Sequence, residues 1–139
     1  MKNTIFLTAT FLAAFLMNSV FAQKQSIKEV TSNQHALENL VAGIQSDNLG
    51  VKRSSIYFAG KYRIAEAEDV LVDQLKVEED PSTRILIALV LYEMDSEKGL
   101  SEVKNLSMND DNEKVKRMTI QIYNEYLTND GGRTVFITE

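Results

Sequence analysis

The sequence has no cysteine, one histidine, one proline and six glycines among its 139 residues. Without cysteine the chain can form no disulfide and has no thiol for the lipid of an exported lipoprotein. The single histidine, His35, leaves little material for a nucleophile activated by a neighbouring base. The scarcity of proline and glycine leaves few helix-interrupting residues. These absences favour a helical fold that is held together by burial alone.

The N-terminal segment has the three parts of a secretory signal peptide. Lys2 is its only charge, an apolar run follows from Ile5 to Met17, and Val20-Phe21-Ala22 offers compact residues to an export peptidase. A retained membrane anchor would need about 20 continuous apolar residues. Three polar residues interrupt this stretch: Thr8, Thr10 and Asn18. We expect cleavage after Ala22, a periplasmic or secreted location, and no stable membrane insertion afterwards.

The rest of the chain is acidic. The full sequence has a net charge of −5, and removal of Lys2 with the signal peptide makes the remainder more negative by one unit. The length that remains after residue 22 is usual for one domain. A negative chain is poorly suited to bind phosphate backbones or anionic lipids. We therefore expect one domain that does not bind nucleic acid.

Apolar residues spaced three and four apart predict helices through most of the remaining chain. Asp80 and Pro81 mark a helix start, because aspartate caps free backbone amides and proline fits the first turn. The run from Ile85 to Leu91 is apolar on every face, and its continuation to Met94 favours a covered helix over a buried strand. The expected helices cover residues 33–46, 51–62, 67–77, 81–94, 98–106 and 112–128.

Two segments lie outside this helical pattern. Residues 23–32 are polar and weakly patterned, and we interpret them as a linker. Asp130-Gly131-Gly132 is expected to end the last helix, and residues 134–138 have the composition of a strand. The predicted organisation is a signal peptide over 1–22, a linker over 23–32, a repeat domain over 33–128 and a C-terminal tail over 129–139.

The helices repeat with a period of about 32 residues. Three arginines near helix starts lie at nearly even intervals, and an aspartate precedes each. Ala67 and Leu71 recur one period later as Gly99 and Val103. A small residue at the corner of a hairpin allows two helices to approach closely. Such periods are typical of stacked units that cannot bury their apolar faces alone.

The repeating segments resemble the HEAT-repeat family, in particular the short bacterial HEAT-like repeats also found in phycobilisome lyases. VKRSSIYFAGKYRIAEAEDVLVDQL, residues 51–75, resembles one unit, and STRILIALVLYEMDSEKGLSEVKNL, residues 82–106, resembles a second. Residues 33–46 would be the second helix of an incomplete unit, and 112–128 the first helix of another. The resemblance implies an all-α fold, a short right-handed solenoid of helical hairpins. A plain antiparallel helical bundle is the alternative.

The resemblance also implies a ladder of acids and arginines along the stack. In the family the acid caps the first helix of a unit, and the arginine reaches between neighbouring units. An acid near a basic first turn is physically reasonable, because the basic residue alone opposes the helix dipole. Unrelated surface charges are the alternative. The ladder residues would be Asp47, Asp80 and Asp111 with Arg53, Arg84 and Arg117.

No residue cluster indicates catalysis, and the sequence predicts a protein that is not an enzyme and has no cofactor. The many acids fall at helix starts and on polar faces, where they favour the helix dipole and solubility. Residues 109–113 offer several oxygens to a calcium ion, but they lack the ligand spacing of an EF-hand loop, and helix capping explains them. A lyase-like tetrapyrrole site would rest on fold analogy alone.

We expect a non-enzymatic protein-binding or scaffolding module of the cell envelope, because repeat stacks expose extended surfaces. The partner would be an envelope or secreted protein, and self-association through the ends of the short stack is also expected. The second helices would supply the contact surface: Asp69, Asp73 and Lys76 share one face by their spacing, and Ser101 and Asn105 occupy the corresponding positions one unit later.

A second hypothesis concerns the C-terminal tail. Val135, Phe136 and Ile137 give it more apolar surface than a solvated end usually has. Residues 133–138 could add as a strand to a partner's sheet, which would make the protein an accessory or chaperone-like subunit. Alternatively, the tail could fold back and cap the last helix.

Overall fold

The computed structural model describes residues 34–134, with side chains from 35 to 129. The predicted signal peptide and linker, and the part of the expected strand after Thr134, lie outside the described residues. The chain divides into two units, residues 1–37 and 38–139. The packing described below is that of the second unit.

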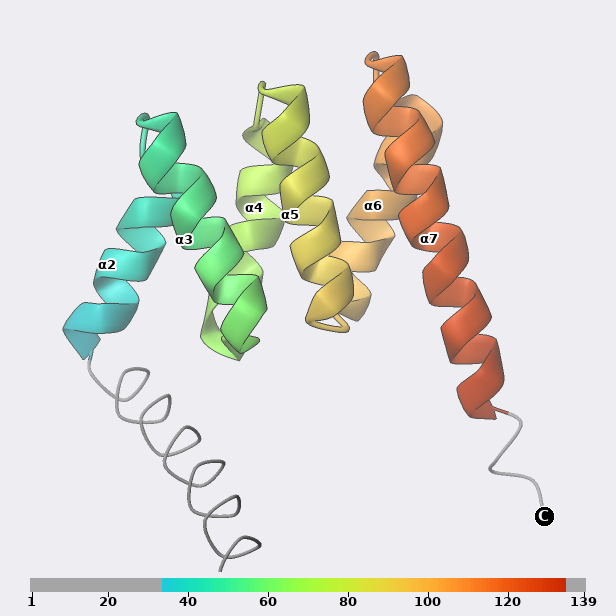
Figure 1. Ribbon diagram of the computed structural model, residues 1–139, viewed down its shortest axis with the longest axis horizontal. Helices are drawn as coiled ribbons and strands as arrows, with labels where there is room; N and C mark the ends of the chain where they lie inside the picture. The colour runs from blue at the N-terminus through green and yellow to red at the C-terminus, as the bar shows by residue number, and fades with distance from the viewer. Residues whose placement is uncertain (1–33, 135–139) are drawn as a thin grey trace, which may run out of the picture. The chain divides into compact units, whose positions relative to one another are not determined.

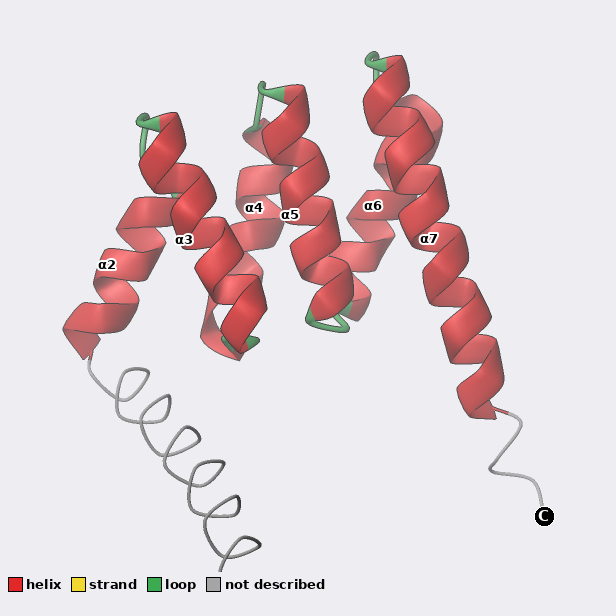
Figure 2. Ribbon diagram, viewed as in Figure 1, coloured by secondary structure: helices red, strands yellow, loops and turns green. Residues whose placement is uncertain are grey.

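All the secondary-structure elements of the described residues are helices, joined by short loops (Figure 2), which confirms the predicted all-α class. The chain contains no strand between residues 34 and 134. A short 3-10 helix, η1, directly precedes α4 in the chain. The elements are α2 (Gln34–Ile44), α3 (Leu49–Tyr62), η1 (Ala65–Ala67), α4 (Glu68–Val77), α5 (Pro81–Glu93), α6 (Glu97–Asn109) and α7 (Glu113–Thr134).

The helices of the second unit form two rows. The first helices α3, α5 and α7 lie side by side, and the second helices α4 and α6 lie behind them (Figure 1). We call the packing of α3 against α5 the first joint, and that of α5 against α7 the second joint.

α5 is at the centre and contacts α3, α4, α6 and α7. The expectation that the run Ile85–Leu91 forms a helix covered on most sides is confirmed, since only Leu86 and Leu89 of this run are not buried.

Two turns of the same structure join the first helices to the second helices. Arg63 ends α3 and Asp95 follows α5, and both have left-handed backbone, with φ of 47° and 58°. In each turn the next residue donates a backbone hydrogen bond of 3.0 Å to a carbonyl five residues earlier, Ile64 to Ala59 and Ser96 to Leu91. This is the hydrogen bond that closes a helix end in the Schellman motif. Arg63 and Asp95 are one repeat of 32 residues apart (95 − 63). Residues that are one or two such repeats apart are called equivalent below.

Glycines allow the helices to approach closely at two places. A Cβ atom added to Gly60 of α3 would lie 2.7 Å from a γ-carbon of Val90 in α5. One added to Gly99 of α6 would lie 2.7 Å from a δ-carbon of Leu91 in α5. The predicted role of a small residue at the hairpin corner is thus confirmed for Gly99, and the equivalent Ala67 is fully buried.

The last helix differs from the prediction. α7 continues through Asp130-Gly131-Gly132 to Thr134, so the expected helix stop is wrong and Arg133 and Thr134 belong to the helix. Glycine ends a helix when it adopts left-handed backbone, and no glycine in residues 34–134 has positive φ. Although α7 has 22 residues, no helix of the described region is both long and apolar enough to cross a membrane.

Candidate interaction surface and the repeat joints

The first helices begin at three equivalent caps. Asn48 Oδ1 accepts the backbone N–H of Gly50 and Val51 at 3.0 and 3.1 Å. Asp80 Oδ2 accepts that of Thr83 at 2.7 Å. Asn112 Oδ1 accepts the backbone N–H groups of residues 114 and 115 at 3.0 and 3.2 Å. These side chains satisfy amides that have no partner inside the helix.

The caps correct two of the predicted ladder positions. Asp47 and Asp111 each lie one residue before the cap and are exposed. Asparagine and aspartate cap helices about equally well, so the sequence alone could not decide between the neighbouring residues. Asp80 is a cap, as the resemblance implied.

A second acceptor lies two residues before each cap. Ser46 Oγ, Glu78 Oε1 and Asp110 Oδ1 accept the backbone N–H of the cap residue at 3.1, 3.0 and 2.8 Å. The two carboxylates are buried, whereas Ser46 is half-buried. The position two residues before the cap therefore holds an acid only at the two starts that lie inside a joint.

Each of these buried acids binds a basic residue from the preceding first helix. Lys52 Nζ of α3 lies 2.8 Å from Glu78 Oε2, and Arg84 Nη2 of α5 lies 3.2 Å from Asp110 Oδ1. Both pairs span 26 residues of sequence. Since Lys52 and Arg84 are equivalent, and Glu78 and Asp110 are too, one interaction is repeated at the two joints. We call these two interactions the joint pairs.

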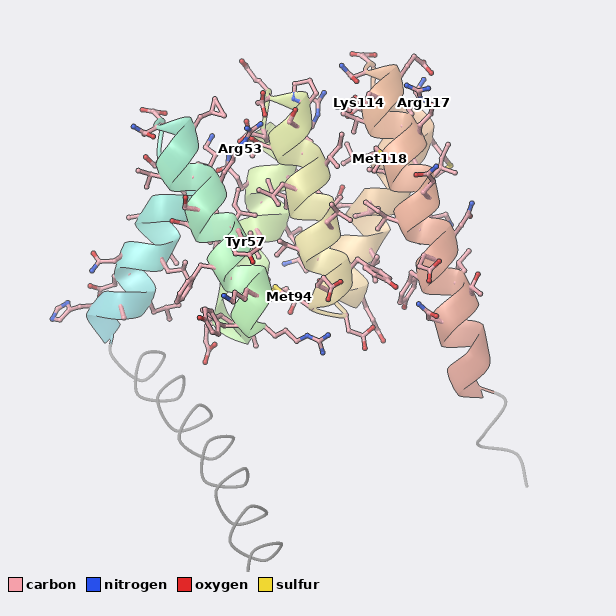
Figure 3. The ribbon with its side chains drawn as sticks, in the orientation of Figure 1. Arg53, Tyr57, Met94, Lys114, Arg117 and Met118 are labelled. Atoms are coloured by element: carbon pink, nitrogen blue, oxygen red, sulfur yellow. The ribbon has the colours of Figure 1, made fainter. Side chains whose placement is uncertain are left out.

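Arg53 makes a further contact in the first joint (Figure 3). Its Nη2 lies 2.8 Å from Asp80 Oδ2, and its Nε donates to Thr83 Oγ1 at 3.0 Å. The residues equivalent to Arg53 and Thr83 in the second joint are Ile85 and Val115, both buried. The same position is therefore polar in one joint and apolar in the other.

The predicted ladder is thus corrected in its pairing. Arg53 does reach Asp80, but Arg84 binds Asp110 and not Asp111. Arg117 is exposed beside the first turn of α7, on the side away from α5 (Figure 3), and forms no hydrogen bond or ion pair with any described residue. The structural repeat has a constant length. In this register Glu79 is equivalent to Asp47 and Asp111, and Ile85 is equivalent to Arg53 and Arg117. Asp80 and Arg84 are therefore each displaced by one residue from the other predicted ladder positions.

Burial and hydrogen bonding oppose each other at Glu78. Burial raises the pKa of its carboxyl, but hydrogen bonds from Lys52, the Asp80 backbone and Gln74 hold the pKa below its usual value. The pKa of Asp80 is also lowered, chiefly by the hydrogen bond from the Thr83 hydroxyl and also by Arg53, although burial opposes this. Both groups are therefore charged acceptors in the folded protein near neutral pH.

The five residues predicted to bind a partner lie on α4 and α6, and all five are exposed. Asp69 Oδ1 lies 2.6 Å from Lys98 Nζ, which links the start of α4 to α6. Lys76 Nζ lies 3.4 Å from Asp73 and 3.9 Å from Glu102. These contacts bring polar side chains together on adjacent helices. We call this set the α4–α6 surface; it comprises Asp69, Asp73, Lys76, Lys98, Ser101, Glu102 and Asn105.

Sequence reasoning missed Lys98 and Glu102 in this surface. A signal was present for Glu102, because it follows Lys76 by 26 residues, the separation of the joint pairs. No such signal was present for Lys98. It lies 29 residues from Asp69, and this separation differs from that of the joint pairs. The hydrogen bond between them lowers the pKa of Asp69 and raises that of Lys98.

The segment considered for calcium serves as a helix start. Asp110 and Asn112 accept hydrogen bonds from backbone amides and from Arg84, so the capping interpretation is confirmed. Among the side chains that the structure describes, residues 35–129, no group of three or more His, Asp or Glu is placed to hold a metal ion. His35 is exposed in the first turn of α2.

No family model matches the sequence, and no curated protein and no solved structure is significantly similar to it.

Proposed function

We propose that the protein is an exported, non-enzymatic HEAT-like repeat protein that serves as a protein-binding or scaffolding module of the cell envelope. In this proposal its helical hairpins form a short right-handed solenoid. The regular repetition of caps, left-handed turns and joint pairs supports a solenoid over a bundle. A bundle needs no constant translation between successive helix pairs, whereas a solenoid is built from it.

The observation that carries the proposed function is the α4–α6 surface. Ser101 and Asn105 occupy on α6 the positions equivalent to those of Asp69 and Asp73 on α4. Polar side chains are thus presented at regular intervals along adjacent second helices. In repeat stacks such surfaces bind extended partners. The exposed acids at Asp69 and Asp73 suit a partner that presents basic side chains.

The buried polar groups support a structural rather than a catalytic use of the interior. All five buried polar side chains of the described region are held at helix starts, at joints or by their own helix. Ser96, for example, accepts the backbone N–H of Gly99 at 2.8 Å and donates to Glu68 at 2.5 Å. Thr119 donates to the carbonyl of Val115 at 2.8 Å. The five residues are Glu78, Thr83, Ser96, Asp110 and Thr119.

The test is affinity capture from the envelope fraction of the source organism. The bait is the full chain, produced in an export-competent host, and mass spectrometry should find its N-terminus at Gln23. We expect Asp69→Lys with Asp73→Lys to remove a partner that the wild-type protein captures, while circular dichroism shows that the variant is folded. A mass that retains residues 1–22 would refute export.

The matched control is Asp47→Lys with Asp111→Lys. This control changes the net charge by the same amount and also replaces two exposed acids. These acids lie at the starts of first helices, outside the α4–α6 surface. The control should capture the partner as well as the wild type does. Equal capture by both double variants would show that the α4–α6 surface is not the binding surface.

A further inference from the structure

The side of each first helix that faces the next one is buried in the joints but open on α7. Ile56 of α3 and Ala88 of α5 are fully buried. The equivalent residue of α7 is Ile120, which is 43% exposed. No described helix follows α7 to cover it. Thus α7 presents the surface of a joint that has no second half among the described residues.

The opposite end of the row has the complementary gap. Thr83 and Val115 are fully buried where α5 and α7 face the preceding helix, but the equivalent Val51 of α3 is 48% exposed. Further along α3, Phe58 is 40% exposed, whereas its equivalents Val90 and Ile122 are buried. Terminal units of soluble repeat stacks usually have polar outer faces. Both ends of this row are instead partly apolar.

The polar half of a joint is also present on α7. Lys116 is equivalent to Lys52 and Arg84, the basic members of the two joint pairs. Its partner in the described region is Glu113, one turn away on the same helix at 3.3 Å. Arg117, beside it, is equivalent to Arg53 and is exposed. At the start of α3, Asn48 has the cap geometry of the other joints, and the adjacent Asp47 is an exposed acid.

We infer that the open side of α7 binds the open side of α3 in a second copy of the chain, head to tail. Ile120 then lies against the Val51 side of the second copy, and Lys116 and Arg117 lie toward Asp47. The contact continues both joints with the same register, but Ser46 stands where the joints have Glu78 and Asp110, and the neighbouring Asp47 supplies the acid at this helix start. It does not depend on the α4–α6 surface or on its partner.

The incomplete hairpins agree with this arrangement. α7 is a first helix with no described second helix after it, and α2 ends in Gly43 and Ile44, which are buried as in a second helix. An added Cβ at Gly43 would clash with Ser55 of α3, so this end of α2 packs closely against α3. Head-to-tail contact places α2 of one copy next to α7 of the other, where a complete hairpin has its second helix.

The test compares three variants of the full chain by sedimentation velocity over a concentration series up to about 1 mM. Ile120→Glu alters the α7 side, and Val51→Glu alters the α3 side, so that the two altered sides carry the same charge and cannot pair in a mixture. Leu89→Glu is the control, because Leu89 is an exposed apolar residue on the central helix α5. We expect the wild type and the control to associate increasingly with concentration. Association should weaken by about tenfold or more in each end variant, and circular dichroism should show that both remain folded.

Mixing the two end variants distinguishes head-to-tail contact from other modes. Each variant retains the side that the other has lost, so a 1:1 mixture should form a dimer that grows no further. A wild type that remains monomeric throughout the series would overturn the inference. So would end variants that associate normally, or a mixture that remains monomeric, since the intact side of each variant would then not bind the intact side of the other.

Discussion

Glu78 combines three interactions in one buried side chain. It accepts hydrogen bonds from Lys52 Nζ, Gln74 Nε2 and the backbone of Asp80, at 2.8, 2.8 and 3.0 Å. It therefore orients the start of α5 while it binds α3. A residue that serves a helix start and a joint together should influence stability more than an exposed acid does.

The pKa values of Glu78 and Asp80 predict how stability depends on pH. Both lie below their usual values of 4.5 and 3.8 in the folded protein. A carboxylate with a lowered pKa stabilises the fold fully above its unfolded pKa, and this contribution is lost as the pH falls through the folded pKa. We expect the free energy of unfolding, from urea titrations, to decline once the pH falls below about 4.5.

Glu78→Gln tests this assignment. The variant should lose about 2 kcal/mol at pH 7, because a charged hydrogen-bond acceptor is removed from buried donors. Its stability should also vary less between pH 5 and pH 3 than that of the wild type. Asp111→Asn, at an exposed acid outside the joints, should reproduce the wild-type profile. Identical pH profiles for Glu78→Gln and the wild type would contradict the role assigned to Glu78.

Arg63 is held in backbone geometry that suits glycine. Left-handed backbone costs an L-residue with a β-carbon about 1–2 kcal/mol, and the ion pair of Arg63 with Glu93 is long, at 3.7 Å, and exposed. Arg63→Gly should therefore raise the free energy of unfolding by about 1 kcal/mol. Lys61→Gly, two residues earlier inside α3, should lower it by a similar amount. If both variants are destabilised, the turn does not carry the strain assigned to it.

At the scale of the helices, the joints combine close packing with buried ion pairs. Gly60 lets α3 approach α5 at one end of the first joint, and Lys52 and Arg53 connect the helices at the other. The second joint has Arg84 in place of Lys52, but Ile85 in place of Arg53. Joints of equal geometry can therefore be built from different side chains, provided that the total volume at the contact is kept.

Gly60→Ala tests the close approach. Alanine normally stabilises a helix by about 1 kcal/mol relative to glycine. Here the new Cβ would lie 2.7 and 2.9 Å from the γ-carbons of Val90, a stiff β-branched side chain. We expect a loss of about 1–3 kcal/mol instead, measured by urea unfolding.

Val90→Ala provides the control for Gly60→Ala. The double variant should be more stable than the sum of the two single effects predicts, by about 1 kcal/mol or more, because the second change creates room for the first. Additive effects would mean that the helices separate freely at this point and that Gly60 is not required there.

Much of the helical architecture could be predicted from the sequence. The apolar periodicity located each helix to within a few residues except at the end of α7, and the Asp80-Pro81 start is correct. The end of α7 was not predicted, because Gly131 and Gly132 can either stop a helix or continue it. The outcome depends on whether a left-handed turn and its hydrogen bonds form, and the sequence does not specify that.

The pairing in the joints was harder to predict than the helices. Asp110 and Asp111 are chemically identical neighbours, and only the register of the repeat decides which of them faces Arg84. The α4–α6 surface was predicted in part, because residues that share a helix face follow from spacing. Lys98 was missed because its contact depends on how two separate helices align.

At the scale of the whole second unit, one set of contacts is used repeatedly and both ends remain open. α5, with neighbours on all sides, holds the most completely buried apolar segment. α3 and α7 each have one side that lacks a described neighbour. A short repeat array therefore has its most stable part in the middle and its interaction potential at the ends.

The short sequence separation of the joint contacts also has a consequence for folding kinetics. The hydrogen bonds of Lys52, Arg53 and Arg84 across the joints connect residues 26–30 positions apart. Closing such loops costs little chain entropy, and proteins of low contact order fold rapidly. Folding can thus begin at either hairpin and spread to its neighbour. In the exported protein proposed above, a segment emerging from the export channel would gain its first long-lived contacts after about two helices, without waiting for the rest of the chain.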